Sequence, residues 1–288
     1  MNQYKSFTLI ELLVVIVIIG VLAGVIMIST SSSINKADIA KGIAFSSTMN
    51  NELLSNLIAE YTFDEGPTIS GDATNSDVKD LWGNYDGTVT GHAPDVLTGS
   101  NCLFGKCLDF NGTTDYIDLG TAFGNFRTND FTVSVWVKMP KDAAYRAIFA
   151  KGVVNATDFL LYKPSSDNIV IYCDTGILNI STLAWQHNEW TYIVATRKSG
   201  IAKLYINGRY INQDTSASVD LNNTHNWNIG ASEDGTQRFF DGLIDEVRIY
   251  DAGLSLSQIR KDYIMGLNAL LSNNTLSKKE YNERISDL

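Results

Sequence analysis

The chain has 288 residues, enough for one or two domains, and a formal net charge of −10 at pH 7. Residues 1–58 carry no net charge and residues 256–288 carry +1, so residues 59–255 carry −11. This acidic surface repels nucleic-acid phosphates and excludes nucleic acid as an expected partner, whereas it is compatible with divalent cations and neutral glycans.

The first predicted element is an apolar helix over residues 7–28, FTLIELLVVIVIIGVLAGVIMI. A helix of this length spans roughly 33 Å, enough for the hydrocarbon core of a bilayer. Glu11 is its only charged residue, and an ionisable residue inside such a segment indicates a function. A secretory signal peptide would have a shorter apolar core and a small-residue exit site, and this segment matches neither feature.

The leader MNQYKS and the apolar helix together resemble the class III signal of type IV pilins and pseudopilins. The resemblance implies cleavage between Ser6 and Phe7 by a prepilin peptidase, followed by N-methylation of Phe7. It also implies that the new amine pairs with Glu11 of a neighbouring subunit. Pilins usually have Gly before the cut, where this chain has Ser6.

This resemblance also implies partners and a location. We expect one helix to hold the protein in the cytoplasmic (inner) membrane. The protein would then be displayed extracellularly, with other pilin subunits, in a pilus or pseudopilus. An α-ammonium group in hydrocarbon needs a counter-charge, which agrees with the expected role of Glu11 in filament assembly.

The helical pattern continues beyond the apolar segment. Apolar residues recur at steps of three and four from Ile34 to Leu57, with polar residues between them. We therefore expect one long helix from about Thr8 to Ile58, with a pilin-type N-terminal helix over residues 7–58 after a leader of residues 1–6. Its second half is amphipathic.

From Ala59 onward the pattern changes to short runs of β-branched and aromatic residues separated by Gly, Asn and Asp. Asn207–Gly208 between two such runs predicts a type I′ hairpin. The clearest predicted strands cover residues 59–63, 107–110, 115–119, 131–139, 147–152, 158–163, 168–174, 190–198, 202–208, 209–214, 226–231 and 241–251. Strands at this density without interleaved helices predict an antiparallel β-sandwich.

The order of the motifs narrows the fold further. The set comprises YTFDEG, DLWGNYDGTV, FGKCLDFNGTTDYIDLG, FTVSVWVK, EWTYIVATR, LYINGR and FFDGLIDEVRIYDAGLSLSQI. In this order they resemble the bacterial LamG-like jelly roll of the concanavalin A-like lectin/glucanase superfamily. The resemblance covers residues 59–259 and places a jelly-roll domain at 59–255.

Calcium is the expected cofactor. Alternation along the strand 243–250 puts Asp245 on the apolar face with Val247 and Ile249, where a carboxylate must be paired or coordinated. The LamG-like resemblance implies calcium ligands at Asp80, Asn84 and Asp245, and such hard oxygen donors suit Ca²⁺. The alternative is that Asp245 accepts backbone N–H groups from a neighbouring loop and that Asp80 begins a turn.

Three cysteines give an odd count. Cys102 and Cys107 flank LFGK, a spacing that can bring two strand ends to disulfide distance, and export permits oxidation. A loop this short adds about 2 kcal/mol of stability. The alternative is two small apolar residues in neighbouring strands, and we expect Cys173 to be a buried thiol.

Glycan recognition would use exposed aromatic side chains. Trp82, Trp185 and Trp227 lie in or beside predicted loops and are the candidate ligand-binding residues, although packing is the alternative for each. Trp136 and Trp190 lie within predicted strands, where we expect them in the core.

Catalytic signatures are not expected. The glucanases of the superfamily carry Glu-x-Asp-x-(x)-Glu on one strand face, and this sequence has no such spacing. The three histidines have no zincin spacing, and G-x-S-x-G and phosphate-loop motifs are absent from the sequence. We therefore predict no enzymatic activity.

The C-terminal residues 256–288 read as two short helices. The first begins at Leu254–Ser255 with Leu256, Ile259 and Tyr263 on one face, and Ser277 is the expected N-cap of the second. The tail is either a helical cap on the sandwich or a short oligomerisation motif, which it resembles.

The sequence thus predicts a mainly β protein, with a long N-terminal α-helix, an antiparallel jelly roll and short C-terminal helices. Its predicted function is that of a minor pilin-like subunit whose head serves adhesion or recognises a glycan or another surface ligand. The alternatives are a type II secretion pseudopilin and a membrane-tethered glycan-processing enzyme.

Overall fold

The chain divides into two units, Met1–Ser55 and Asn56–Leu288, and the second, called the head, is described below. The predictions for residues 1–53, including Ser6, Phe7 and Glu11, lie outside the described residues. The computed structural model describes residues 54–64, 77–90, 94–121, 126–152, 158–166, 168–173, 176–180, 186–215, 217–218, 220–232 and 235–288.

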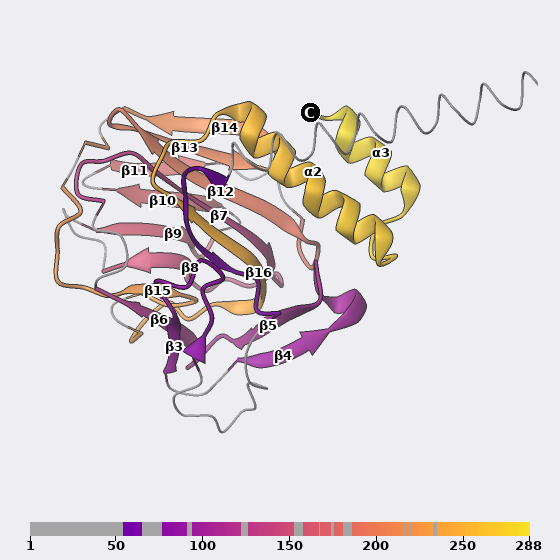
Figure 1. The fold of residues 1–288 in the computed structure, drawn as a ribbon, viewed down its shortest axis with the longest axis horizontal. Helices are drawn as coiled ribbons and strands as arrows, with labels where there is room; N and C mark the ends of the chain where they lie inside the picture. Colours follow the sequence, from indigo (N-terminus) through magenta and orange to yellow (C-terminus); the bar gives the residue numbers. More distant parts are fainter. Residues whose placement is uncertain are drawn as a thin grey trace, which may run out of the picture. The chain divides into compact units, whose positions relative to one another are not determined.

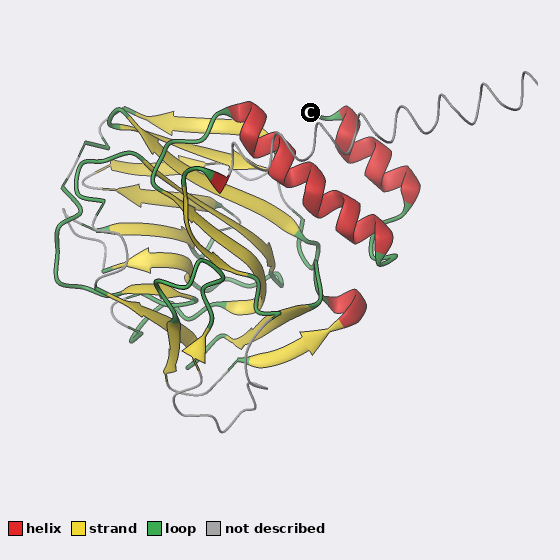
Figure 2. Ribbon diagram, viewed as in Figure 1, coloured by secondary structure: helices red, strands yellow, loops and turns green. Residues whose placement is uncertain are grey.

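Two antiparallel sheets, A and B, make up the body of the head (Figures 1 and 2). In spatial order, sheet A consists of β14 (Arg209–Asp214), β13 (Ile201–Ile206), β12 (Thr191–Lys198), β7 (Phe131–Lys138), β16 (Asp241–Tyr250), β5 (Lys106–Asn111) and β4 (Asp95–Thr98), with β1 (Leu57–Tyr61) paired to β16. Sheet B consists of β11 (Gly176–Ile180), β10 (Ile169–Cys173), β9 (Phe159–Lys163), β8 (Arg146–Lys151), β15 (Trp227–Ile229), β6 (Tyr116–Gly120), β3 (Gly87–Thr90) and β2 (Asp77–Val78).

The main hydrophobic core is built from both sheets. Alternate residues of β7, Val133, Val135 and Val137, belong to it from sheet A, and Trp227 and Ile229 belong to it from sheet B. This alternation is the period-two pattern of strands with one face on a core. The predicted mainly β, antiparallel, jelly-roll-like fold is therefore confirmed for the described residues.

Strand β1 corrects the predicted end of the N-terminal helix. We assigned Leu57 and Ile58 to the helix, but Leu57 pairs with Tyr250 and Ala59 with Ile249 in an antiparallel ladder. The burial of Leu57, Ala59 and Tyr61 alternates with partial exposure of the residues between them. Pairing with β16 therefore overrides the helical spacing at this point.

Strand β16 corrects the predicted position of Asp245. A register shift between Asp245 and Arg248 interrupts the pairing with β7, and Glu246 has a φ of 52°. Such a β-bulge reverses the alternation, so Ile244 and Val247 both face the core. Asp245 therefore lies on the opposite face, not on the apolar face that simple alternation predicts.

Helices α2 and α3 follow the sandwich, as predicted (Figure 2). Helix α2 (Leu256–Ser272) begins with a capping box formed by Ser255 and Gln258, and α3 (Lys278–Ser286) begins at the predicted N-cap Ser277. Among the described residues, no helix is long and apolar enough to span a membrane.

Helix α2 covers the outer face of sheet A (Figure 1). The Tyr263 ring stacks on Trp136, with 5.6 Å between centroids, and Gly266 lies against the same indole. A side chain at position 266 would collide with that ring, so glycine allows the close approach. This packing favours the helical-cap interpretation of the tail.

The predicted hairpin is confirmed between β13 and β14. Asn207 and Gly208 have φ values of 51° and 72°, as a type I′ turn requires. The Asn207 side chain also accepts a hydrogen bond from the Tyr192 backbone N–H, which ties the turn to β12.

Candidate functional site

The loop between β2 and β3, residues 79–86, is called the Trp82 loop. The buried Asp80 carboxylate organises it by accepting four backbone N–H groups. Its Oδ1 accepts from Glu60 at 2.8 Å and Trp82 at 3.0 Å, and its Oδ2 accepts from Asn84 and Tyr85, each at 3.2 Å. Because Glu60 belongs to β1, this carboxylate ties the end of sheet B to sheet A.

Further bonds hold the Trp82 loop in one conformation. The Leu81 N–H donates to the Glu60 carbonyl at 2.9 Å, and the Tyr61 hydroxyl donates to the Tyr85 carbonyl at 2.5 Å. Burial and the nearby Asp80 and Asp86 charges raise the pKa of Tyr61, which keeps its hydroxyl a donor. The loop is therefore preorganised before any ligand arrives.

This rigid loop exposes large apolar side chains. Trp82 and Leu81 are each 42% exposed, although both are side chains that proteins usually bury. Polar groups lie beside them in the chain. Asn84 is exposed, and Lys79 forms an ion pair with Asp86 at 2.5 Å. An exposed aromatic ring with neighbouring amide, ammonium and carboxylate groups can stack on a sugar and bond its hydroxyls.

The Asp245 carboxylate anchors a different loop, residues 99–105 between β4 and β5. Its Oδ2 accepts the backbone N–H groups of Leu103 at 2.9 Å and Phe104 at 3.3 Å, and its Oδ1 accepts that of Glu246 at 2.8 Å. Burial first, and then the neighbouring Glu246 charge, raise the pKa of Asp245 well above its ordinary value.

The side chains of the three predicted calcium ligands take part in hydrogen bonds within the head. The oxygens of Asp80 and Asp245 already accept seven N–H groups between them, and the Asn84 amide donates to the Trp82 carbonyl at 3.4 Å. A calcium ion needs those lone pairs itself. Within the described ranges, no three His, Cys, Asp or Glu residues are placed to hold a metal ion. Calcium binding stays a prediction.

The tryptophans predicted to bind a ligand differ in their exposure. Trp227 is fully buried and packs against the Phe149 ring at 5.3 Å, so its assignment as a ligand-binding residue is wrong. Trp227 follows a polar loop in the sequence, which suggested exposure. It is nevertheless the first residue of β15, a strand of three residues that are all buried. Trp185 lies outside the described residues. Trp136 and Trp190 are buried, as predicted.

The structure contains the Cys102–Cys107 disulfide, with 5.3 Å between the Cα atoms. It closes the loop that Asp245 anchors, and both cysteines are fully buried. Cys173 is a buried thiol in β10.

A buried ion cluster connects β1, β16 and α2. The Arg248 guanidinium contacts Glu60 of β1 at 2.6 Å, Asp262 of α2 at 2.9 Å and its neighbour Glu246. Asp262 also accepts the Tyr192 hydroxyl at 2.5 Å. Three carboxylates thus share one arginine, and burial raises the pKa of Glu246 to about 7.

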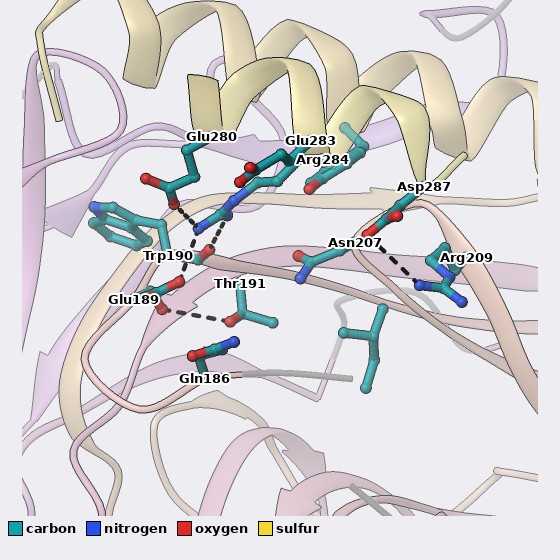
Figure 3. A pocket seen from close by; sticks show the side chains of 12 residues that line it. Gln186, Glu189, Trp190, Thr191, Asn207, Arg209, Glu280, Glu283, Arg284 and Asp287 are labelled. Atoms are coloured by element: carbon teal, nitrogen blue, oxygen red, sulfur yellow. Dashed lines mark hydrogen bonds and ion pairs between the residues drawn. The ribbon is translucent and has the colours of Figure 1, made fainter. Parts of the chain in front are cut away.

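A cavity of about 370 Å³ lies between α3 and the edge of sheet A (Figure 3). Arg284 of α3 crosses it and donates to the Trp190 carbonyl at 3.1 Å, to Glu189 at 2.9 Å and to Glu280 at 2.7 Å. The cavity is lined by Gln186, Glu189, Trp190, Thr191, Ile206, Asn207, Arg209, Tyr263, Glu280, Glu283, Arg284 and Asp287.

Sequence reasoning missed this cavity. Glu280, Glu283 and Asp287 recur at steps of three and four, which places them on one face of α3, and this spacing was the available signal. The spacing alone could not show that sheet A supplies the opposite wall.

The comparisons with known proteins agree with the fold. Residues 111–260 match the family described as the Concanavalin A-like lectin/glucanases superfamily, and residues 1–27 match the prokaryotic N-terminal methylation motif. Because the first match covers more than half of the chain, the chain belongs to the concanavalin A-like lectin/glucanases superfamily. Its N-terminal motif is of the type IV pilin or pseudopilin kind. No curated protein matches the chain significantly.

Solved structures share the fold of the head. Domain 4 of AbnA, an extracellular GH43 arabinanase from Geobacillus stearothermophilus solved with arabinotriose, is 23% identical with a TM-score of 0.54, over 72% of this chain and 98% of that one. The binding domain of Paraclostridial Mosquitocidal Protein 1 is 18% identical with a TM-score of 0.54, over 74% and 53%.

A Trypanosoma rangeli sialidase is 17% identical with a TM-score of 0.53, over 73% of this chain and 32% of the sialidase. The match therefore spans about a third of that enzyme. At these identities the likeness shows the fold alone.

Proposed function

We propose that the chain is a minor subunit of a type IV pilus-like filament whose head binds a neutral glycan through the Trp82 loop. The observation that carries the binding site is the 42% exposure of Trp82 on a loop that Asp80 holds rigid. The N-terminal methylation motif supports the filament role, and the lectin-like fold supports the ligand class.

The charge of the head supports a neutral glycan. A net −11 on residues 59–255 opposes anionic ligands, whereas stacking on an indole ring requires no ligand charge. The structure of AbnA domain 4 was solved with arabinotriose, a neutral oligosaccharide, and this agrees with the proposed ligand class.

The binding role is tested on a glycan array with the detergent-solubilised full chain. Trp82→Ala should weaken binding at least about tenfold, because a central aromatic contact carries a large share of binding energy. Tyr210→Ala is the matched control, since Tyr210 is a 46% exposed aromatic on β14, outside the loop. Equal binding by Trp82→Ala and wild type would refute the assignment of the site.

The calcium prediction is tested in the same assay. Binding that EDTA abolishes and calcium restores would support a cation at Asp80, Asn84 or Asp245. Binding that EDTA leaves unchanged would contradict the calcium prediction but leave the role of Trp82 intact.

The filament role needs a separate measurement. Glu11→Ala should leave the protein in the membrane and out of sheared filaments, as judged by mass spectrometry and immunogold labelling. Normal assembly of this variant would overturn the pilin role of Glu11. Recovery of the wild type in a secretion pseudopilus would instead favour the pseudopilin alternative.

A further inference from the structure

The loop of residues 99–105, here called the disulfide-closed loop, contains Cys102, whose bond to Cys107 closes a ring of residues 102–107, while Ser100 and Asn101 directly precede that ring. Other parts of the head dock on this loop. Three side chains donate to its backbone carbonyls. Trp190 Nε1 donates to Asn101 at 3.2 Å, Thr275 Oγ1 to Ser100 at 2.9 Å, and Asn273 Nδ2 to Cys102 at 3.0 Å. Each bond requires a carbonyl that points in a fixed direction, because hydrogen bonds weaken steeply away from linear geometry.

Two of these three donors belong to the turn between α2 and α3. Asn273 is the C-cap of α2, and Thr275 lies two residues further on, before α3 begins at Lys278. The hydrogen bonds of Asn273 and Thr275 to the disulfide-closed loop therefore help to fix the direction in which the chain enters α3.

Helix α3 also has contacts outside this loop, and its Tyr281 hydroxyl donates to Asn268 Oδ1 of α2 at 2.8 Å. None of its residues is buried, and the ion pair between Arg209 and Asp287 is long, at 3.9 Å, with both side chains more than half exposed. Exposed ion pairs contribute little stability. The stronger contacts are those of Arg284 with Glu189 and the Trp190 carbonyl, in the segment just before β12, and the Trp190 side chain also bonds to the loop.

The cavity depends on the same docking, because α3 supplies one of its walls and the segment from Gln186 to Thr191 supplies another (Figure 3). Trp190 bonds to the disulfide-closed loop through its indole N–H and to Arg284 through its carbonyl. The loop thus touches both walls, one through Trp190 and the other through the α2–α3 turn.

We propose that the Cys102–Cys107 disulfide is a redox latch that docks α3 and completes the cavity beside it. In the dithiol chain the loop samples several conformations, the α2–α3 turn loses its acceptors, and α3 detaches while the sandwich remains folded. Oxidation restores one loop conformation and with it the cavity.

The closing step is a thiol–disulfide exchange with an external disulfide, such as oxidised glutathione or a disulfide oxidoreductase. The thiolate of one cysteine attacks the external disulfide and forms a mixed disulfide, which the second thiolate then resolves. The external disulfide accepts two electrons and the two thiol protons and leaves as two thiols, while one S–S bond forms between Cys102 and Cys107.

Both cysteines are fully buried, which makes reduction of the closed disulfide slow. An external thiol reaches the closed disulfide only after local opening, so reduction is slow once α3 has docked. We therefore expect the latch to close once, in an oxidising compartment, and to stay closed.

The test is amide hydrogen exchange on the detergent-solubilised full chain. The double variant C102A/C107A should raise the exchange rates of residues 278–286 at least about tenfold, while the amides of β7 keep their protection. Phosphine reduction of the wild-type chain should give the same pattern without any sequence change.

Two further variants separate the latch from a general loss of stability. Asn273→Ala keeps the disulfide but removes a bond to the disulfide-closed loop, so it should also raise exchange in α3. Ser100→Ala keeps its backbone carbonyl and should change nothing. The proposal is overturned if the opened disulfide leaves exchange in α3 unchanged, or if β7 and α3 lose protection together.

Discussion

The Trp82 loop and the disulfide-closed loop are both held by a buried carboxylate that accepts backbone N–H groups, but they present different groups to their surroundings. Asp80 accepts four N–H groups, three of them from its loop, and Asp245 of β16 accepts three, two of them from the disulfide-closed loop. The Trp82 loop turns its large side chains to solvent, whereas the disulfide-closed loop offers its carbonyls to neighbouring parts of the head. A rigid loop can therefore either display a surface or support a docked element.

The difference lies in what surrounds each carboxylate. Asp245 is fully buried beneath a covalently closed loop, next to the bulge that carries Glu246. Asp80 is 4% exposed and belongs to a loop without a covalent closure. We expect loss of Asp245 to affect the stability of the head, and loss of Asp80 to affect mainly the order of one loop.

Asp245→Ala should have the largest effect, a loss of about 3 kcal/mol in the free energy of unfolding, because three N–H groups lose their acceptor in a buried site. Urea unfolding measures this change. Asp251→Ala is the control, since Asp251 is an exposed carboxylate just beyond the same strand. Equal stability of the two variants would contradict the anchoring role of Asp245.

Glu246→Gln should change the pH dependence of stability. Burial raises the pKa of Glu246 to about 7, against the attraction of Arg248, and Glu60, Asp262 and Asp64 raise it further. The folded state therefore binds this proton more tightly than the unfolded state. The resulting stability is fully present below pH 4.5 and is lost as the pH rises through 7, by about 2 kcal/mol between pH 5 and 7.

Glutamine cannot titrate, so Glu246→Gln should remove that part of the slope. Urea unfolding at pH 5, 6, 7 and 8 measures it for both proteins. The raised pKa of Asp245 contributes a slope of the same sign, which the variant retains. Identical slopes for the two proteins would show that Glu246 does not carry the effect.

Asp80→Ala should cost less, about 1–2 kcal/mol, because three of its four N–H partners lie in a loop that can move and reach water. We expect faster amide exchange in residues 81–86 with unchanged exchange in β7. Asn84→Ala is the matched control in the same loop, since its side chain makes only a long bond of 3.4 Å. Slower or unchanged exchange in Asp80→Ala would contradict the preorganisation of the loop.

Local rules predicted the features that depend on few residues. The Cys102–Cys107 pair, the N-cap at Ser277 and the turn at Asn207–Gly208 each follow from spacing or turn chemistry within a handful of positions. Ordered motifs and alternation were enough to predict the two-sheet fold.

The errors concern features that depend on distant partners. The bulge at Glu246 reverses the face of Asp245, and only pairing with β7 reveals it. Trp227 lies near the start of a predicted strand, beside a loop, and its burial becomes evident only when the Phe149 ring of the neighbouring strand is placed against it. The cavity needs α3 and sheet A together, which no local pattern encodes.

The smallest expected effect concerns the exposed ring in each loop. Trp82 is 42% and Phe104 is 37% exposed, so truncation of either should change the free energy of unfolding by less than about 0.5 kcal/mol. Urea unfolding of Trp82→Ala and Phe104→Ala measures both. A loss of about 2 kcal/mol in Trp82→Ala would mean that the indole packs on the head as a structural residue. Near-neutral values for both would show that, in each loop, the buried carboxylate supplies the stability and the exposed ring does not. Trp82 would then be available for a ligand.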